Sequence, residues 1–329
     1  MEEDFLKLRE IIHKEKNFFL TTHLNPDLDG VSAIVAFCWY LRSLGKDFCA
    51  CIERLPRNAK FLPGREFLTE EGNCPELKGE EVVLVFDANT PSRIPDKIFK
   101  ATKKAKYFVV IDHHYLEEGK EVFPRQELSI IAPEVASTTL LLLKYFKTIG
   151  FEITPEVATN LMAGLYFDTG GFKFENANKC EVFKCAEELC LAGAKPSLIA
   201  REIFENIPFD EVIALKKVIS RTKFVCKDVV TSYLTAEDFK ELSSKNIEYL
   251  SNFLRSIEGV NVSALVKEVE PGFIAVSLRS RAPVEVLEFA QSWGGGGHKY
   301  ASGFKVQSKS LEDFLLELEN RLRSYYCAK

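Results

Sequence analysis

Two apolar stretches decide the fold of this chain: EVVLVFD at residues 81–87 and KYFVVID at residues 106–112. Each contains five consecutive apolar or aromatic residues and then ends on an aspartate. A strand with both faces buried has this pattern, because neither face carries polar side chains to solvent. A third predicted strand, residues 17–22, ends on His23. We therefore predict central strands of a parallel sheet at these three places.

Helical patterns alternate with the predicted strands. Apolar residues recur at helical spacing in five segments, at 4–15, 32–44, 97–104, 136–149 and 155–167. This alternation predicts an α/β domain whose N-terminal, mostly parallel sheet has helices on both faces. Ligands bind at the carboxyl ends of the strands in open sheets of this kind. His23, Asp87 and Asp112 stand at those ends.

The pattern changes after the first domain. Residues 178–220 are helical, and strands then return at 222–225, 229–234, 260–269, 274–278 and 303–306, before a terminal helix from Leu311. We predict a metal-binding catalytic domain at 1–192, a helical connector at 193–221 and a smaller C-terminal α+β domain for substrate at 222–329.

Composition limits the class of protein. The chain has 329 residues and a net charge of -5, which argues against a long non-specific nucleic-acid track, because such tracks need many contacts from Lys and Arg to phosphate. A short anionic substrate remains compatible with this charge. No apolar run reaches the roughly 20 residues that span a bilayer, and the acidic start Met1-Glu2-Glu3-Asp4 is unlike a signal peptide. We expect a cytoplasmic protein without a membrane partner.

The cysteines are consistent with that compartment. There are nine, an odd number, and none forms a CxxC pair. Scattered cysteines in apolar and helical context favour reduced thiols over a disulfide framework.

Acids and imidazoles gather at the predicted strand ends. The first cluster is His23-x-x-x-Asp27-x-Asp29, in which Pro26 forces a turn. Asp27 and Asp29 leave that turn two residues apart and can serve different ions, and Asp87 suits a bridge between two sites. In Asp112-His113-His114 we expect one histidine as a ligand, the aspartate to orient it, and the other histidine to face substrate.

Asp168 completes the set, in apolar surroundings. Taken singly, Asp87 or Asp168 would be a helix cap or a turn residue. Gathered at one sheet edge, however, these acids would repel one another without cations. The mixed Asp and His ligands predict two divalent metal ions, with manganese preferred and magnesium or zinc as alternatives.

A glycine run near the C-terminus has phosphate-binding character. Gly294, Gly295, Gly296 and Gly297 lead directly into His298. Successive glycine N–H groups can converge on an anion, although glycine clusters also form flexible loops. Arg279 and Arg281 end a strand shortly before, where they either bind phosphate or remain solvated. Phe172 and Phe174 flank Lys173 and could stack a base, but core packing is the favoured role.

These motifs, in this order, resemble the DHH family of phosphoesterases with its companion DHHA1 domain. The resembling motifs are the His23–Asp29 cluster, Asp87, Asp112-His113-His114, Asp168, and Gly294–His298 with Ala301-Ser302-Gly303-Phe304. Ala136-Ser137-Thr138 and Asp168-Thr169-Gly170-Gly171-Phe172 resemble the subgroup of nanoRNases and 3′-phosphoadenosine 5′-phosphate phosphatases.

The resemblance implies a ligand for each metal at the matching positions. One ion would sit on His23, Asp27 and Asp87. The other would sit on Asp29, Asp87, His113 and Asp168, with His114 near the scissile phosphate. Substrate would be bound by Ser137, by Arg279 and Arg281, and by Gly294–His298.

We therefore expect hydrolysis of short RNA or DNA oligonucleotides, dinucleotides and nucleotide bisphosphates to mononucleotides. A hydroxide bridging the metals would attack phosphorus, and His114, Asp112 and Arg279 would act in catalysis, in a cleft between the two domains. The alternatives are a direct cyclic dinucleotide phosphodiesterase, a family II-like inorganic pyrophosphatase, a single-strand exonuclease and a non-enzymatic nucleotide-binding regulator. A homodimer is left open.

Overall fold

The computed structural model describes residues 1–116, 122–123, 126–242, 247–308 and 310–327. The chain divides into two compact units, Met1–Asn206 and Ile207–Lys329.

The first unit is built on one six-stranded sheet in which every pairing is parallel. Its strands are β1 (Asn17–Thr21), β2 (Asp47–Ile52), β3 (Leu68–Glu70), β4 (Val82–Phe86), β5 (Tyr107–Asp112) and β6 (Leu128–Ile131). Their order across the sheet is β3-β2-β1-β4-β5-β6. The predicted α/β class is confirmed.

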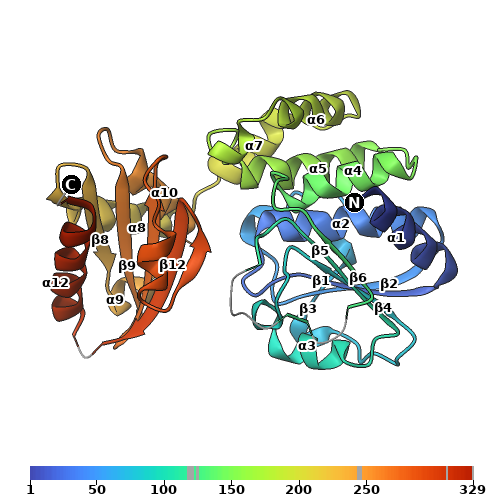
Figure 1. Ribbon diagram of the computed structural model, residues 1–329, viewed down its shortest axis with the longest axis horizontal. Helices are drawn as coiled ribbons and strands as arrows, with labels where there is room; N and C mark the ends of the chain where they lie inside the picture. Colours follow the sequence, from blue (N-terminus) through green and yellow to red (C-terminus); the bar gives the residue numbers. More distant parts are fainter. Residues whose placement is uncertain (117–121, 124–125, 243–246, 309, 328–329) are drawn as a thin grey trace. The chain divides into compact units, whose positions relative to one another are not determined.

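Helices cover both faces of this sheet (Figure 1). One face carries α1 (Glu2–Lys14), α2 (Leu28–Ser43), α4 (Thr138–Thr148) and α5 (Pro155–Asp168), and the other carries α3 (Asp96–Thr102). Alternate residues of the central strands enter the two cores. Leu20, Leu84 and Ile111 lie in the first, and Phe19, Val83 and Val110 lie in the second. Each such buried side chain contributes about 1.5–3 kcal/mol to stability.

The strand order reverses direction between β1 and β4. The chain runs outward from β1 to β2 and β3, and then returns to β4 and runs outward the other way through β5 and β6. A crevice forms at the carboxyl end of such a switch point, because the flanking loops leave in opposite directions. His23 follows β1 and Asp87 follows β4, so both belong to this crevice.

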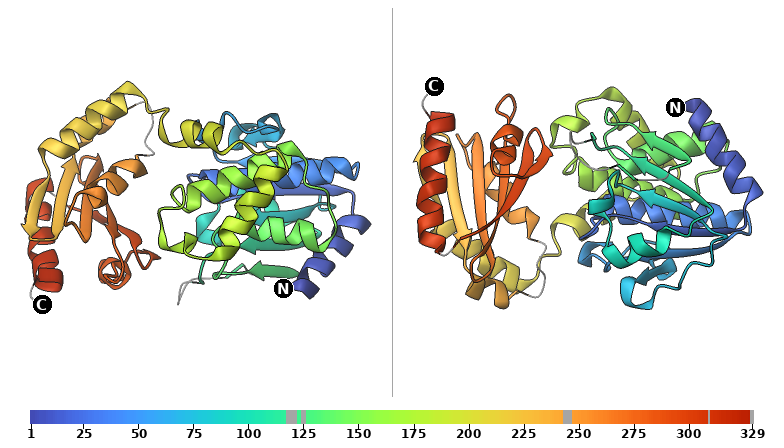
Figure 2. Two further views of the ribbon diagram at one scale, coloured as in Figure 1. Left: turned by 90° about the horizontal axis from the view of Figure 1, so that it is seen from above. Right: turned by 60° about the horizontal axis from the view of Figure 1, so that its bottom comes forward.

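The second unit contains a mixed six-stranded sheet. Its strands are β7 (Lys223–Cys226), β8 (Val229–Leu234), β9 (Val262–Glu270), β10 (Phe273–Ser280), β11 (Gly296–His298) and β12 (Ala301–Gln307), in the order β11-β12-β10-β9-β8-β7. β9 and β10 form the predicted antiparallel pair. One core packs α11 (Leu287–Gln291) and α12 (Leu311–Leu322) on the sheet, and the other packs α8 (Phe209–Ser220), α9 (Ala236–Lys240) and α10 (Glu248–Ser256). Figure 2 shows α12 lying along the strands.

The predicted connector consists of helices. α7 (Pro196–Phe204) contacts α5 in the first unit, and α8 contacts β8 in the second. α6 (Cys180–Leu191) also packs on α5. None of the helices in the described part of the chain is long and apolar enough to cross a membrane.

Two sequence expectations are wrong. The helix predicted to start at residue 32 starts at Leu28, because the Asp27 side chain accepts hydrogen bonds from the N–H groups of Asp29 and Gly30 and so caps α2. Asp29 therefore lies in a helix and not in a loop. The cysteines are also not all free thiols, since Cys51 is bonded to Cys74 and Cys226 to Cys327. Both partners of each pair are distant in sequence, and only the fold brings them together.

Candidate metal centre

Five chain segments deliver the predicted ligands to one edge of the first sheet. His23, Asp87 and Asp112 come from the ends of three neighbouring strands, and Asp112 is itself the last residue of β5. The start of α2 supplies Asp27 and Asp29, and the end of α5 supplies Asp168.

Asp87 lies at the middle of the cluster. Its Oδ2 is 3.3 Å from Nε2 of His23, and its Oδ1 is 3.6 Å from Nε2 of His113. On the outer sides, Nε2 of His23 is 3.6 Å from Asp27 Oδ2 and Nε2 of His113 is 3.0 Å from Asp168 Oδ2. The two oxygens of one carboxylate thus face two different imidazoles, which is the arrangement of a bridging ligand.

Three groups of side chains could each hold a cation, among the residues that the structure describes. They are His23 with Asp27 and Asp87; Asp29 with His113 and Asp168; and Asp87 with His113 and His114. Within each group the ligand atoms lie within 4.8 Å of one another. The structure therefore brings together all six residues that the sequence predicted as metal ligands.

The hydrogen bonds of the two histidines test whether a cation fits. Nδ1 of His23 donates to the carbonyl of Leu24 over 2.8 Å, and Nδ1 of His113 donates to the carbonyl of Val135 over 3.2 Å. A carbonyl only accepts, so in the neutral ring the lone pair is on Nε2. Both Nε2 atoms are buried, and within the described residues each faces carboxylate oxygens, which in their charged form can only accept. Lone pairs of nitrogen and carboxylate oxygen facing each other require a positive charge between them, and a divalent metal fits.

The ionisation of the cluster is consistent with this need. Burial lowers the pKa of His23 and His113, but the neighbouring carboxylates, Asp27 and Asp168 first, outweigh it and hold both pKa values well above the usual range. Burial raises the pKa of Asp29, and repulsion from Asp168 and then Asp87 raises it further. Burial would also raise the pKa of Asp87, yet His114 and His23 hold it well below normal. The raised pKa values of the two histidines mean that protons compete with cations for this centre.

Asp112 has a different partner from the one expected. The sequence argument had it orienting the ligand histidine, but its Oδ1 lies 2.7 Å from Nδ1 of His114 and 3.2 Å from the N–H of the same residue. Burial lowers the pKa of His114, whereas Asp87 and then Asp112 raise it, to about 9. Asp112 therefore orients His114, and Val135 orients His113.

Ser137 also has a role that the sequence argument did not assign. It is fully buried, and its hydroxyl caps α4 by accepting from the N–H of Leu140 over 3.0 Å. This burial argues against direct contact with substrate. The next two residues, Thr138 and Thr139, contact the ligand carboxylates and were missed. The sequence feature that could have indicated these contacts is the run of three hydroxyl residues, Ser137, Thr138 and Thr139, at the start of an apolar helix.

Backbone strain is concentrated at this centre. Among the described residues, the non-glycine residues with positive φ are Asn25, Asp87 and Phe172, at 50°, 59° and 64°. Asn25 lies between His23 and Asp27, Asp87 is itself a predicted ligand, and Phe172 lies in the turn that follows Asp168, the last residue of α5. Such conformations cost of order 1–3 kcal/mol each and cluster at functional sites, where the surroundings enforce them. Here the N–H of Asn25 donates to Glu53 over 2.5 Å, and Arg54 donates to the Asn25 side chain.

The glycine run is partly a strand and not an open loop. Residues Gly296–His298 form β11, paired with β12. A side chain at position 297 would meet the carbonyl of Ala301 at 2.6 Å, so the glycine there is needed for close strand packing. A phosphate-binding role for Gly294, Gly295, Gly296 and Gly297 stays a prediction.

Two residues predicted to bind phosphate, Arg279 and His298, lie on either side of Ala301 in the second sheet. Arg279 pairs with Ala301, and Ala301 pairs with His298 on its other side. Directly paired residues project from the same face of a sheet, so Arg279 and His298 flank Ala301 on one face. The guanidinium of Arg279 donates to Asn252 Oδ1 over 3.3 Å, and that of Arg281 donates to the carbonyl of Arg255 over 3.0 Å.

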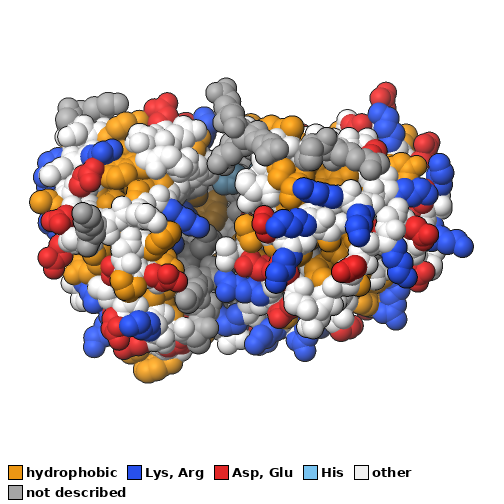
Figure 3. Space-filling model, turned by 90° about the horizontal axis from the view of Figure 1, so that it is seen from below, with side chains coloured by type: hydrophobic (Ala, Val, Ile, Leu, Met, Phe, Trp, Pro, Cys, Tyr) orange, Lys and Arg blue, Asp and Glu red, His pale blue; other side chains and the backbone are white. Residues whose placement is uncertain are grey.

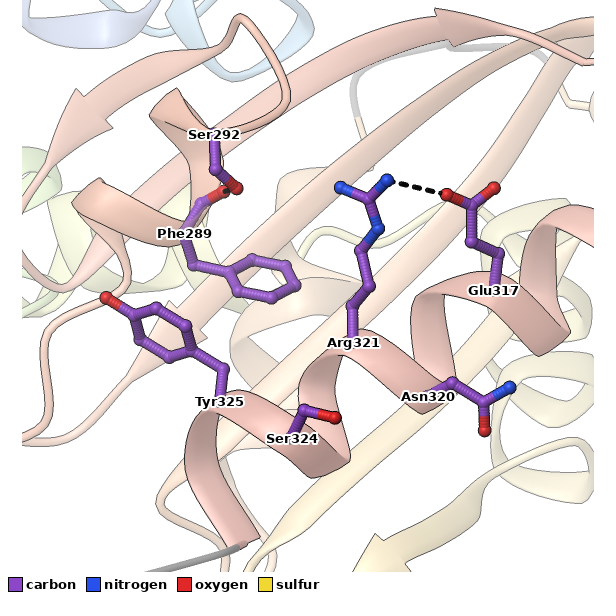
Figure 4. Close-up of a pocket in the computed structure, with 7 residues that line it drawn as sticks. All are labelled: Phe289, Ser292, Glu317, Asn320, Arg321, Ser324 and Tyr325. Atoms are coloured by element: carbon purple, nitrogen blue, oxygen red, sulfur yellow. Dashed lines mark hydrogen bonds and ion pairs between the residues drawn. The ribbon is translucent and has the colours of Figure 1, made fainter.

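The second unit also contains a pocket that none of these residues line. It is formed by Phe289, Ser292, Glu317, Asn320, Arg321, Ser324 and Tyr325 (Figure 4). Arg321 forms an ion pair with Glu317 and lies over the ring of Trp293. On the face drawn in Figure 3, Lys and Arg are interspersed with Asp and Glu and form no continuous basic band in the part that is described.

Comparison with known proteins agrees with this architecture. Residues 17–165 match the DHH family, N-terminal domain, and residues 227–324 match the DHHA1 domain. The bifunctional oligoribonuclease and PAP phosphatase NrnA of Thermus thermophilus is 28% identical over 91% of this chain and 86% of its own.

Two solved structures share the fold. An exopolyphosphatase-related protein of Bacteroides fragilis has a TM-score of 0.88 at 23% identity, covering 99% of this chain and 97% of its own. RecJ of Thermus thermophilus in complex with Mn²⁺ has a TM-score of 0.59 at 16% identity, covering 98% of this chain and 55% of its own. Residues 17–165 therefore form a domain of the DHH family, and residues 227–324 form a DHHA1 domain.

Proposed function

We propose that this protein is a metal-dependent phosphoesterase that hydrolyses dinucleotides and short oligonucleotides to mononucleotides, and 3′-phosphoadenosine 5′-phosphate to AMP. The observation that carries the proposal is the position of Asp87, whose two oxygens face the imidazoles of separate ligand groups. The similarity to an oligoribonuclease and PAP phosphatase along most of the chain supports the substrate class. We also propose a cytoplasmic location, where the paired cysteines Cys51–Cys74 and Cys226–Cys327 would be kept as reduced thiols.

Two divalent cations would be held by the clustered side chains. His23, Asp27 and Asp87 would hold one, and Asp29, Asp87, His113 and Asp168 the other. When bound, such a pair supplies a nucleophilic water at neutral pH and neutralises charge on phosphoryl oxygens. Manganese is the cation to test first, because mixed imidazole and carboxylate ligands suit it and a RecJ structure of the same fold contains Mn²⁺.

The chain's own residues would position substrate. His114, held at Nδ1 by Asp112, is oriented for interaction with the phosphoryl oxygens. In the second unit, Arg279 and His298 would bind a further phosphate, with Arg281 and the glycine run beside them. An arginine guanidinium can donate two parallel hydrogen bonds to the oxygens of one phosphate. The small side chain of Ala301 leaves space between Arg279 and His298.

A substrate panel tests this proposal. The purified protein is incubated with Mn²⁺ and, separately, a linear dinucleotide, a cyclic dinucleotide, 3′-phosphoadenosine 5′-phosphate, pyrophosphate and a long single-stranded RNA. We expect the dinucleotide and the bisphosphate to give the highest kcat/KM, with activity lost on chelation. Preferred hydrolysis of pyrophosphate, or of the cyclic dinucleotide over the linear one, would replace the proposed substrate. No hydrolysis of any of them would contradict enzymatic function.

A further inference from the structure

The N-terminus of α4 contacts a ligand carboxylate through several donors. Asp29 Oδ2 accepts from the N–H of Thr138 over 2.7 Å. Its Oδ1 accepts from the N–H of Thr139 over 3.1 Å and from the Thr139 hydroxyl over 2.6 Å. The first N–H groups of a helix have no partner inside the helix, and the helix dipole there favours negative charge. Asp29 is thereby fixed in a fully buried position.

Thr138 makes a second contact, to a different carboxylate. Its hydroxyl donates to Asp87 Oδ1 over 2.9 Å. Asp29 groups with His113 and Asp168, whereas Asp87 groups with His23 and Asp27 and also with His113 and His114. Thr138 thus bonds by its backbone to a carboxylate of one site and by its side chain to the carboxylate proposed to be shared by both sites.

We propose that Thr138 is a positioning residue that fixes the carboxylates of the two metal sites relative to each other, and that its hydroxyl is needed for full metal occupancy. This inference rests on the proposed function, because it concerns the same pair of cations. Each carboxylate oxygen has two lone pairs. A hydroxyl on one lone pair of Oδ1 orients the carboxylate and leaves the remaining lone pairs for cations.

Burial makes the hydroxyl difficult to replace. Thr138 and Asp87 are 0% and 1% exposed, so water has little access to take over the hydrogen bond. An acceptor that loses a buried donor loses that interaction without compensation. Residues that hold a metal ligand in place commonly change metal affinity or activity by about 10–100-fold when they are replaced.

Two pairs of variants isolate the hydroxyl. Thr138→Val keeps the shape of the wild-type side chain and removes the donor. Thr138→Ala and Thr138→Ser differ from each other by the hydroxyl alone, and this pair decides the question if the valine variant does not fold. Thr148→Val is the matched control, because that hydroxyl donates to a backbone carbonyl at the exposed C-terminal end of the same helix.

The readouts are the Mn²⁺ stoichiometry and dissociation constants from calorimetry, together with kcat and KM for a dinucleotide. We expect the valine and alanine variants to bind the more weakly held Mn²⁺ about 10–100-fold less tightly and to lose kcat more than they raise KM. The serine variant and the Thr148 control should resemble wild type.

Two results would overturn the inference. The first is wild-type Mn²⁺ binding by both the valine and alanine variants. The second is equal loss in the alanine and serine variants, which would make Thr138 a packing residue. The proposed function is judged separately, on the wild-type protein. If wild type binds Mn²⁺ but hydrolyses nothing, the function is refuted, while the calorimetric comparison still tests Thr138.

Discussion

At the scale of single residues, the account depends on how Asp87 and the two buried imidazoles face each other. Asp87 ends a buried strand, adopts a left-handed backbone conformation at φ 59°, and directs one oxygen toward each histidine. The Nδ1 hydrogen bonds of His23 and His113 direct both lone pairs at the same carboxylate. The centre therefore attracts positive charge, whether protons or metals.

This competition predicts that Mn²⁺ binding weakens as the pH falls. Neighbouring carboxylates raise the pKa values of His23 and His113 in the metal-free centre, which favours a proton on each ring, and that proton must leave before the ring binds metal. Raising the pH favours that release. Affinity measured at about pH 6 and about pH 8 should be higher at the higher pH. Calorimetry in two buffers of different ionisation enthalpy should show that protons are released when Mn²⁺ binds. An Mn²⁺ affinity that is the same at both pH values, with no proton release, would contradict this prediction.

The clustering of the candidate ligands could be predicted from the sequence, but their hydrogen-bond partners could not. His23, Asp87 and His113 could be predicted because strand ends meet at one edge of a parallel sheet. The partner of Asp112 could not, because both histidines follow it directly and only side-chain geometry selects His114. The contacts of Thr138 and Thr139 with Asp29 and Asp87 depend on where α4 begins relative to β4. The hydrophobic periodicity of the sequence does not determine that position.

At the scale of elements, α4 and α5 together hold Asp29. Gly164 of α5 faces both Asp29 and Thr139, and a Cβ there would lie 2.5 Å from Asp29 Oδ1 and 2.6 Å from Thr139 Oγ1. The close approach of the two helices thus requires a residue without a side chain at this position.

Gly164→Ala should therefore lower both stability and Mn²⁺ affinity. Overpacking in a core costs typically 1–3 kcal/mol, so we expect a loss of about that size in the free energy of unfolding from denaturant titration. Displacement of Thr139 should also weaken metal binding. Gly72→Ala is the matched control, because a Cβ there meets nothing within 4 Å. Equal behaviour of the two variants would show that α5 does not constrain the site.

Elements with a strong local pattern were predicted, and weak ones were missed. β4 and β5 have continuous apolar runs, whereas β2, β3 and β6 were not predicted. β3 and β6 are short edge strands, and β2 begins at the exposed Asp47. Such strands form because a neighbour provides hydrogen bonds, so tertiary contact decides them. The same holds for β11, where a glycine run that looked like a loop pairs with β12.

At the scale of the whole molecule, charge favours short substrates. The net charge is -5, and chiefly Arg279 and His298 are proposed to contact phosphate outside the metal centre. A site of this kind gains little from a longer strand, because the proposal assigns no contacts to further phosphates.

We therefore expect a weak dependence on salt and on length. With about two phosphate contacts, raising salt from about 50 to about 200 mM should reduce kcat/KM for a dinucleotide by about sevenfold or less. A long single-stranded RNA should bind no more tightly than a short one in fluorescence anisotropy. Tighter binding with increasing length would favour the exonuclease alternative.

Asp87 would serve as a ligand shared by the two proposed metal ions. The most direct test counts Mn²⁺ bound per chain by mass spectrometry or calorimetry and measures dinucleotide hydrolysis, in wild type, in Asp87→Asn and in the exposed control Asp96→Asn. We predict two Mn²⁺ per chain in wild type and in the control. Asp87→Asn should lose at least one ion and roughly 1000-fold in turnover, which corresponds to about 4 kcal/mol of transition-state stabilisation. Two bound Mn²⁺ and near-wild-type hydrolysis in Asp87→Asn would contradict the account.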